Sequence, residues 1–474
     1  IYKVEKQLTK DGAIRDARTL GTPRMLLLGL QHMFAMFGAT ILVPILVNSY
    51  FGGKEQVLSI QVTLFFAGVG TLLFHFISKN KVPAFLGSSF AFLGGFATIA
   101  ALNTGIYAGM AASEKIRYAC GGIVVAGLLY LILAAVMKLV GVKKCMRYLP
   151  PVVTGPIIIS IGLSLAGSAV SNCQTYWPLA ILALLVVIFF NIWGRGLFKI
   201  IPILMGVVVS YIAALIMSAA GATAADGSAL LNFSGLSAAS WAGIPPFRFC
   251  KFDLTSILVM APIALATMME HIGDVSAISA TTGENFIEDP GLHRTLVGDG
   301  FATSLSALFC GPANTTYGEN TGVLELSKVY DPRVIRLAAA FAILLSFIPK
   351  VSEIIASMPS AIIGGISFIL YGMISAIGVR NVVENRVDLT KSRNLIVAAV
   401  ILVCALGFSK GISFTVAGTT VTLTGLAIAA IAGILLNAVL PGKDFVFGSI
   451  GNKGEGADLG FSAPTENVDS ELGD

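Results

Sequence analysis

The chain has 474 residues, of which 55% are hydrophobic and only 12% are charged, and its mean hydropathy is +0.85. This composition excludes an ordinary soluble domain and is typical of a polytopic membrane protein. The formal net charge is +5, but Lys and Arg gather in particular loops rather than on an aromatic-rich face, so no nucleic-acid partner is expected. The 6 cysteines show no metal-ligand spacing, and no metal site is predicted.

Windows of about 20 apolar residues predict the membrane-spanning segments. We expect about fourteen of them, near 24–48, 59–78, 83–102, 118–141, 152–170, 177–193, 199–219, 254–275, 293–310, 314–328, 332–348, 354–377, 391–408 and 417–440. Basic loops alternate with loops poor in Lys and Arg, which by the positive-inside rule places both termini in the cytoplasm. The prediction is an all-α, multi-pass protein of the cell inner (cytoplasmic) membrane with an even number of spans.

Gly and small polar residues interrupt two of these segments, at Leu86–Phe92 and Gly311–Asn320. Broken spans at corresponding places in two halves of a chain indicate the midplane binding site of a transporter. The pair Gln31–His32 in the first span likewise corresponds to Glu270–His271 in the eighth. Seven spans are therefore predicted to repeat, and an odd number per repeat makes the second copy inverted.

Two carboxylates, Glu270 and Asp274, follow the uncharged apolar run Leu258–Met269 and lie one helical turn apart. A charged side chain at the bilayer centre costs roughly 2.5 to 3.5 kcal/mol, so such acids indicate a site. Because the two acids repel each other, one must hold a proton or each must find a donor, which predicts a proton switch. The alternative is that the run ends at the membrane surface. His271, on another helix face, joins the proton-coupling candidates, with simple packing as its alternative.

Glu319 lies in the second interruption, just before the short apolar helix Gly322–Leu326. Backbone freed by an interruption cannot face lipid, so it must line an enclosed cavity and offer its N–H and C=O groups there. The helices after Phe90 and after Glu319 point their positive N-terminal ends toward the same place. Carboxylates beside such groups suit a flat solute with N–H donors and carbonyl acceptors, as a nucleobase has. The alternative is a turn outside the membrane.

A polar pair inside an apolar helix, Gln31–His32, is expected to hydrogen-bond across the bundle. Ser89 and Asn320, one in each interruption, complete the supporting set. Asp299 follows a predicted cytoplasmic loop and is interpreted as structural.

Four strings of residues, Gln31–Thr40, Gly87–Phe92, Asp289–Arg294 and Asn314–Asn320, resemble the uracil permeases of the nucleobase–ascorbate transporter family (nucleobase:cation symporter-2). The resemblance extends from about Thr22 to Pro441, and the last string is highly specific. It implies fourteen spans in two inverted seven-span repeats, with a short strand in the third and in the tenth span. It also implies a core domain of spans 1–4 and 8–11, a gate domain of the other six, and a homodimer through the gate domain.

The implied domain boundaries follow the predicted spans, and each domain is built from two separate stretches of the chain. The core domain comprises residues 23–141 and 254–348, and the gate domain comprises residues 142–220 and 349–441. The remaining segments are a cytoplasmic N-terminal segment 1–22, an extracellular loop 221–253 and a disordered cytoplasmic tail 442–474.

The resemblance also implies roles for single residues. Glu270 and Glu319 would accept the ring N–H groups of uracil, and the backbone at Phe90 and Gly318 would bind its carbonyls. The remaining residues of the implied pocket are Ala39 and Tyr317.

The predicted function is proton-coupled import of uracil by alternating access of the core against the gate, with the proton as coupling ion and no cofactor. Asp274 keeps a xanthine or urate symporter as an alternative, because aspartate there is also typical of those relatives, whereas Glu319 favours uracil over the purines. An anion exchanger or channel of related architecture is a more distant alternative, since buried carboxylates repel a permeant anion. An enzyme is not expected, because no HExxH or GxSxG motif is present.

Overall fold

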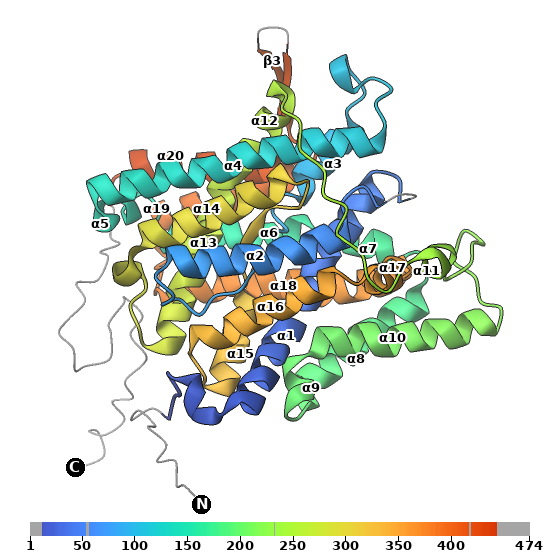
Figure 1. Cartoon of the computed structure of the whole chain (residues 1–474). Helices are drawn as coiled ribbons and strands as arrows, with labels where there is room; N and C mark the ends of the chain where they lie inside the picture. The colour runs from blue at the N-terminus through green and yellow to red at the C-terminus, as the bar shows by residue number, and fades with distance from the viewer. Residues whose placement is uncertain (1–11, 54–55, 232, 417–418, 443–474) are drawn as a thin grey trace, which may run out of the picture.

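The computed structural model describes residues 12–53, 56–231, 233–416 and 419–442, and this part of the chain is mostly helical (Figure 1). Residues 443–474 of the tail 442–474, which is predicted to be disordered, lie outside the described residues. Residues 1–11 of the N-terminal segment also lie outside them. Helices of the first half are α1 (Thr22–Tyr50), α2 (Ile60–Ile77), α3 (Leu93–Ala101), α4 (Ala112–Val140), α5 (Val142–Met146), α6 (Pro151–Ser164), α7 (Ala166–Cys173), α8 (Trp177–Trp193), α9 (Leu197–Ile200), α10 (Pro202–Ala219) and α11 (Ser234–Ala238).

The second half contains nine further α-helices among the described residues, and two short strand pairs complete the fold. These helices are α12 (Leu254–Met260), α13 (Ala264–Thr282), α14 (Leu292–Leu308), α15 (Gly318–Ser327), α16 (Pro332–Ser346), α17 (Pro349–Ala356), α18 (Ser360–Glu384), α19 (Ser392–Gly407) and α20 (Gly425–Val439). The strands are β1 (Leu86–Ser88), β2 (Asn314–Thr316), β3 (Ile412–Val416) and β4 (Thr419–Leu423).

Helix starts follow local sequence signals. Proline occupies one of the first two positions of α1, α6, α8, α10, α16 and α17, where its missing N–H leaves no helical bond unmade. Ser59, Asp331 and Thr424 cap α2, α16 and α20 by accepting a backbone N–H with the side-chain oxygen. Among the described residues, 7 helices are long and apolar enough to cross a membrane, or 8 if the bent pair α16–α17 is one span.

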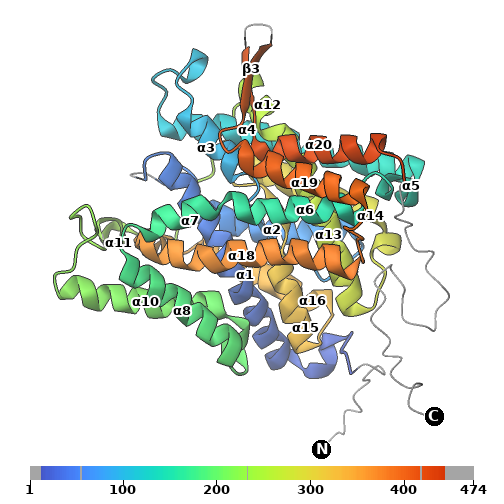
Figure 2. The same cartoon turned by 180° about the vertical axis from the view of Figure 1, so that it is seen from behind.

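The helices pack in two groups that the two opposite views separate. In Figure 1 the near side is formed by α2, α4, α14 and α16, where α14 packs on α2 and α4 and α16 packs on α1 and α2. In Figure 2 the near side is formed by α6, α7, α18, α19 and α20, with α8 and α10 beside them. Contacts between the groups include α13 with α6 and α20, and α1 with α10. Most of the buried apolar side chains form one continuous core.

Two local features differ from the predicted spans. The segment predicted as one span near 354–377 is preceded by a separate helix, α17, and its own helix, α18, runs on to Glu384. The last predicted span near 417–440 is helical only from Gly425, because the preceding residues form the β3–β4 hairpin that projects from the bundle beside α12. The two strands of this hairpin are rich in Thr and Val, whose branched side chains favour strands over helices.

Candidate functional site

The two interrupted segments meet inside the bundle. Strand β1 pairs antiparallel with β2, with Leu86 opposite Thr316 and Ser88 opposite Asn314. The pairing extends by one bond at each end of the ladder, because Ser89 N donates to Ala313 O at 2.8 Å and Tyr317 N donates to Phe85 O at 3.0 Å. All six strand residues are buried, and α3 and α15 begin shortly after the strands. Each interruption thus satisfies the exposed backbone of the other, as membrane interiors require.

Tyr317 joins the two strands to α1. Its hydroxyl donates to Ser88 O at 2.9 Å, and the Ser88 hydroxyl donates to Thr40 O at 2.7 Å. At Gly87 an added Cβ would collide with the Tyr317 ring and lie 2.7 Å from Thr40 Oγ1, so only glycine fits there. Ala39, next to Thr40, is fully buried. The predicted pocket residues Ala39 and Tyr317 therefore lie in one tightly packed layer with β1.

Asp274 lies against the second interruption. Its side chain is only 4% exposed, and its Oδ2 accepts a hydrogen bond from Thr316 Oγ1 at 2.8 Å. A Cβ added at Gly318 would lie 3.7 Å from Asp274 Oδ1 and 2.9 Å from Ile377 Cδ1. The carboxylate of α13 is thus close to the N-terminal end of α15, where the helix dipole favours negative charge. The alternative of a surface position for Asp274 is wrong.

His271 contacts a carboxylate that the sequence interpretation set aside. His271 Nδ1 lies 3.1 Å from Asp299 Oδ2 and 3.4 Å from Thr316 Oγ1, and both ionisable side chains are fully buried. The interpretation of Asp299 as a residue near a cytoplasmic loop is therefore wrong about its environment. The sequence did contain a signal, because Gly298 and Gly300 flank Asp299 and small residues in membrane helices favour close packing. In the structure a Cβ at Gly298 would lie 2.8 Å from the Phe74 ring.

The other predicted carboxylates are less completely described. Glu270 is half-buried, one turn before Asp274 on α13. Glu319 is the second residue of α15, and its side chain lies outside the described part of the chain. The structure therefore brings Glu270 and Asp274 onto the helix that flanks β2 but gives no contact of the Glu319 carboxylate.

The polar pair of α1 makes the cross-bundle contact expected of it through His32. Asn320 Nδ2 donates to His32 O at 3.3 Å and lies 3.4 Å from His32 Nδ1. Gln31 is half-buried, whereas His32, Asn320 and Ser89 are buried. These contacts link α1 to the first turn of α15.

Phe90 connects the first interruption to the other group of helices. Its ring is 5% exposed and stands edge-on to the ring of Tyr371 in α18, with centroids 5.8 Å apart. Tyr371 was not among the predicted site residues, because nothing in its apolar helix distinguishes it from a packing tyrosine.

A cavity of about 730 Å³ opens where α1 ends and α18 begins. Ile45, Asn48, Ser171, Glu353 and Ile363 are among its lining residues, and Gln56 Nε2 donates to Glu353 Oε1 across it at 2.9 Å. None of the predicted binding or proton-coupling residues lines this cavity. Within the described ranges no group of three or more His, Cys, Asp or Glu side chains could hold a metal ion.

Comparison with known proteins assigns this arrangement to a family. Residues 23–414 match the model of a permease family. The chain is 39% identical over 445 residues to a uracil permease of Bacillus caldolyticus, covering 91% of this chain and 94% of that protein. It is 38% identical over 431 residues to a uracil permease of Bacillus subtilis, covering 87% and 91%.

Solved structures of the same fold come from other transporters. The transmembrane domain of the cyanobacterial bicarbonate transporter BicA superposes with a TM-score of 0.57 at 14% identity, covering 88% of this chain and 99% of that one. SLC26A9 gives a TM-score of 0.62 at 12% identity, covering 88% of this chain and 64% of that one. At such identities the likeness concerns the fold alone.

Proposed function

Since this chain belongs to the permease family and, within it, to the uracil permeases of the nucleobase–ascorbate transporters, we propose that it imports uracil by proton symport. It is a multi-pass membrane transporter and not an enzyme. The observation that carries the proposal is the meeting of a buried acid, Asp274, with the β2 strand and the start of α15.

Uracil would bind between the two interruptions. The ring carries two N–H donors and two carbonyl acceptors, so it needs acceptors and donors in one plane. We propose that the Glu270 and Glu319 carboxylates accept hydrogen bonds from the two ring N–H groups. The backbone at Phe90 and Gly318 would donate to the two uracil carbonyls. The free N–H groups at the start of a helix, as at Gly318, suit this role because they have no partner within the helix.

Proton coupling is assigned to Glu270 and Asp274, with His271 beside them. A buried carboxylate is costly unless it is protonated or hydrogen-bonded, and Asp274 already receives the Thr316 hydroxyl. His271 Nδ1 lies 3.1 Å from Asp299 Oδ2 and 3.4 Å from the hydroxyl of the same threonine. A proton taken up from outside would neutralise one of the two acids while uracil is bound, and it would leave with uracil on the inside.

Transport is proposed to follow from movement of a core domain, 23–141 with 254–348, against a gate domain, 142–220 with 349–441. The two packing groups of helices support this division, and Phe90 against Tyr371 is a contact across it. Fourteen spans in two inverted repeats, cytoplasmic termini, an inner-membrane location and a gate-domain homodimer belong to the same proposal. Cysteine pairs that join β1 to β2 should leave uptake intact, whereas pairs that join Phe90 to Tyr371 should stop it.

Uptake of labelled uracil tests the function. Cells that express the protein should accumulate uracil, and a proton uncoupler should abolish accumulation. Excess unlabelled uracil should compete strongly and xanthine weakly. Stronger competition by xanthine would favour the purine symporter that Asp274 keeps open, and uptake that ignores the uncoupler would contradict proton coupling.

A further inference from the structure

An extended segment, residues 240–253, leads from α11 to α12 without helix or strand. Its backbone is bonded to the ends of two helices on one side of the bundle. Gly243 N donates to Phe347 O beside α16, and Cys250 N donates to Leu308 O in α14, both at 3.0 Å. We call residues 240–253 the strap. It crosses the helices at fixed points and is not a free loop.

Two further contacts set the level at which the strap lies. Lys251 N donates to Arg117 O at 3.0 Å, and the Lys251 carbonyl packs so closely on Gly121 that a side chain there would collide with it. Gly121 lies nine residues, or about 13 Å, inside the start of α4. On α2 the Phe65 ring meets Phe247 of the strap at 5.0 Å. The strap therefore lies against the flanks of α2 and α4 and against the ends of α14 and α16.

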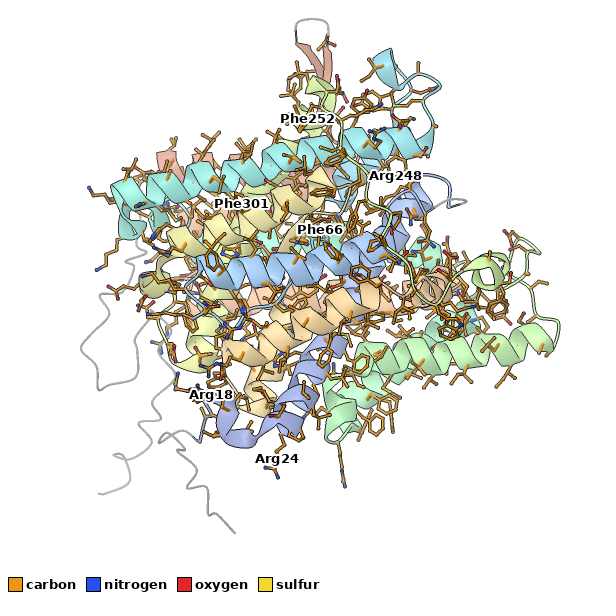
Figure 3. All side chains as sticks on the ribbon, in the orientation of Figure 1. Arg18, Arg24, Phe66, Arg248, Phe252 and Phe301 are labelled. Atoms are coloured by element: carbon orange, nitrogen blue, oxygen red, sulfur yellow. The ribbon has the colours of Figure 1, made fainter. Side chains whose placement is uncertain are left out.

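The strap exposes an unusual number of large apolar side chains. Those exposed by more than half are Trp241 (76%), Ile244 (78%), Phe249 (62%) and Phe252 (55%). Figure 3 shows Phe252 and Arg248 on the same face as Phe301 of α14, whose ring is also exposed. On the neighbouring helix α4, Leu128 and Ile132 are also exposed. The strap thus adds large apolar side chains to an exposed surface of the bundle, and a contiguous apolar surface indicates a contact with a partner or with membrane lipid.

Arg248 supplies the polar element of this surface. It is exposed between Phe247 and Phe249, and in the part of the chain that the structure describes no hydrogen bond or ion pair involves its guanidinium. At the start of the strap, Lys350 Nζ lies 5.3 Å from the centre of the Trp241 ring and donates a hydrogen bond to Leu236 O at 3.3 Å. Aromatic side chains at helix ends with unpaired basic groups are typical of the layer where acyl chains meet headgroups.

We propose that the strap lies in the interfacial layer of the membrane, with Trp241, Phe249 and Phe252 at headgroup level and Arg248 bound to the phosphate of an anionic phospholipid. The planar guanidinium can donate two parallel, charge-assisted hydrogen bonds to one phosphate, whereas a neutral amide lacks the positive charge. The strap would then hold the flanks of α2 and α4 and the end of α14 at a fixed depth. This role is independent of which solute the protein carries.

Depth-dependent fluorescence quenching tests the position of the strap. Trp177→Phe with Trp193→Phe leaves Trp241 as the single tryptophan of the full chain. In nanodiscs, lipids brominated near the headgroup should quench Trp241 more strongly than lipids brominated near the chain ends. A matched control carries Trp241→Phe and Ser228→Trp in the same background, and this exposed polar loop should not be quenched. No quenching of Trp241 by either lipid would overturn the proposal.

A second reporter tests Arg248. With Trp177, Trp193 and Trp241 all replaced by Phe, Phe249→Trp places the only indole beside the guanidinium. A small fraction of brominated phosphatidylglycerol should quench this reporter about threefold to fivefold more than the same fraction of brominated phosphatidylcholine.

Arg248→Gln should remove the difference between the two lipids, and Arg248→Lys should retain most of it. Inorganic phosphate at the concentration of the lipid should leave the difference in place, because the proposed ligand is the membrane phosphate. Equal quenching by the two lipids in the parent reporter, or an unchanged difference in Arg248→Gln, would overturn the assignment to Arg248. Loss of the difference on adding phosphate would show a free-anion site instead.

Discussion

The two interrupted segments share a backbone design but differ in chemistry. Each contributes a three-residue strand followed by a short helix, and the strands pair with each other. Around β1 the partners are hydroxyls and carbonyls, as in the bonds of Tyr317 and Ser88. Around β2 the partners are ionisable, with Asp274 and His271 both near Thr316. One half thus presents a neutral platform and the other the titratable groups.

The difference is already present in the flanking helices. Gln31–His32 of α1 corresponds to Glu270–His271 of α13, and the residue four after the first of each pair is Ala35 in α1 but Asp274 in α13. A single buried proton site is easier to accommodate than two facing each other, because like charges in a low-dielectric interior repel strongly. The comparison shows that two segments with the same backbone design can have neutral partners in one half of the chain and ionisable partners in the other.

The largest effect is expected in the second interruption, Gly311–Asn320, which has the ionisable partners. Glu319→Gln should weaken uracil binding by about 2 to 4 kcal/mol, because the amide accepts a hydrogen bond less strongly and turns a donor toward a ring N–H. Calorimetric titration of the purified protein measures the change. Glu325→Gln, an exposed position on the same helix, is the matched control and should bind as the parent does. Equal affinity in both variants would remove Glu319 from the site.

In the first interruption, Leu86–Phe92, a single added methyl group should lower the stability of the protein. Gly87→Ala forces a Cβ against the Tyr317 ring and Thr40 Oγ1, which should lower the free energy of unfolding by about 1 to 3 kcal/mol. Thermal unfolding in detergent measures the loss. Gly94→Ala in α3 meets no atom within 4 Å and is the control. Equal melting temperatures for the two variants would show that β1 is not tightly packed against Tyr317.

A charge change at Asp274 sharpens the assignment of titration to the second half. Asp274→Asn can still accept the Thr316 hydroxyl, so uracil affinity should be retained within about threefold. Removing a negative charge beside Glu270 makes proton release easier, and the fall of uptake with rising external pH should move to lower pH by about one unit. The pH profile of initial uptake rates measures it. Thr98→Ser on α3, away from the pair, should leave the profile unchanged, and an unmoved profile in Asp274→Asn would argue against the pair.

The smallest effect is expected for a hydrogen bond of the neutral half. Tyr317→Phe removes the donation to Ser88 O and should cost about 0.5 to 1.5 kcal/mol of stability, with little change in the pH profile. Tyr118→Phe, at a half-buried tyrosine of α4, is the comparison and should cost less stability than Tyr317→Phe. A shifted pH profile in Tyr317→Phe would mean that the two interruptions are coupled more closely than their partners indicate.

The sequence alone determined those properties that depend on short stretches of chain. Apolar length and turn residues located the helices and both interruptions, because hydrophobicity and helix-breaking residues act locally. The acid pair Glu270 and Asp274 was found for the same reason, since i and i+4 positions are neighbours on any helix. The resemblance of Asn314–Asn320 to a known family supplied the family and, with it, the predicted solute.

Only the tertiary structure decided which distant groups meet. The register of β1 with β2, the contact of His271 with Asp299 and the ring of Tyr371 on Phe90 each join residues far apart in sequence. The burial of Asp299 depends on how closely α14 packs on α2 and α4, and hydropathy along one helix contains no information on its neighbours. The sequence likewise predicted that the strap is an ordinary polar connection. Only the structure shows that its exposed aromatic side chains lie on the face that carries Phe301 of α14.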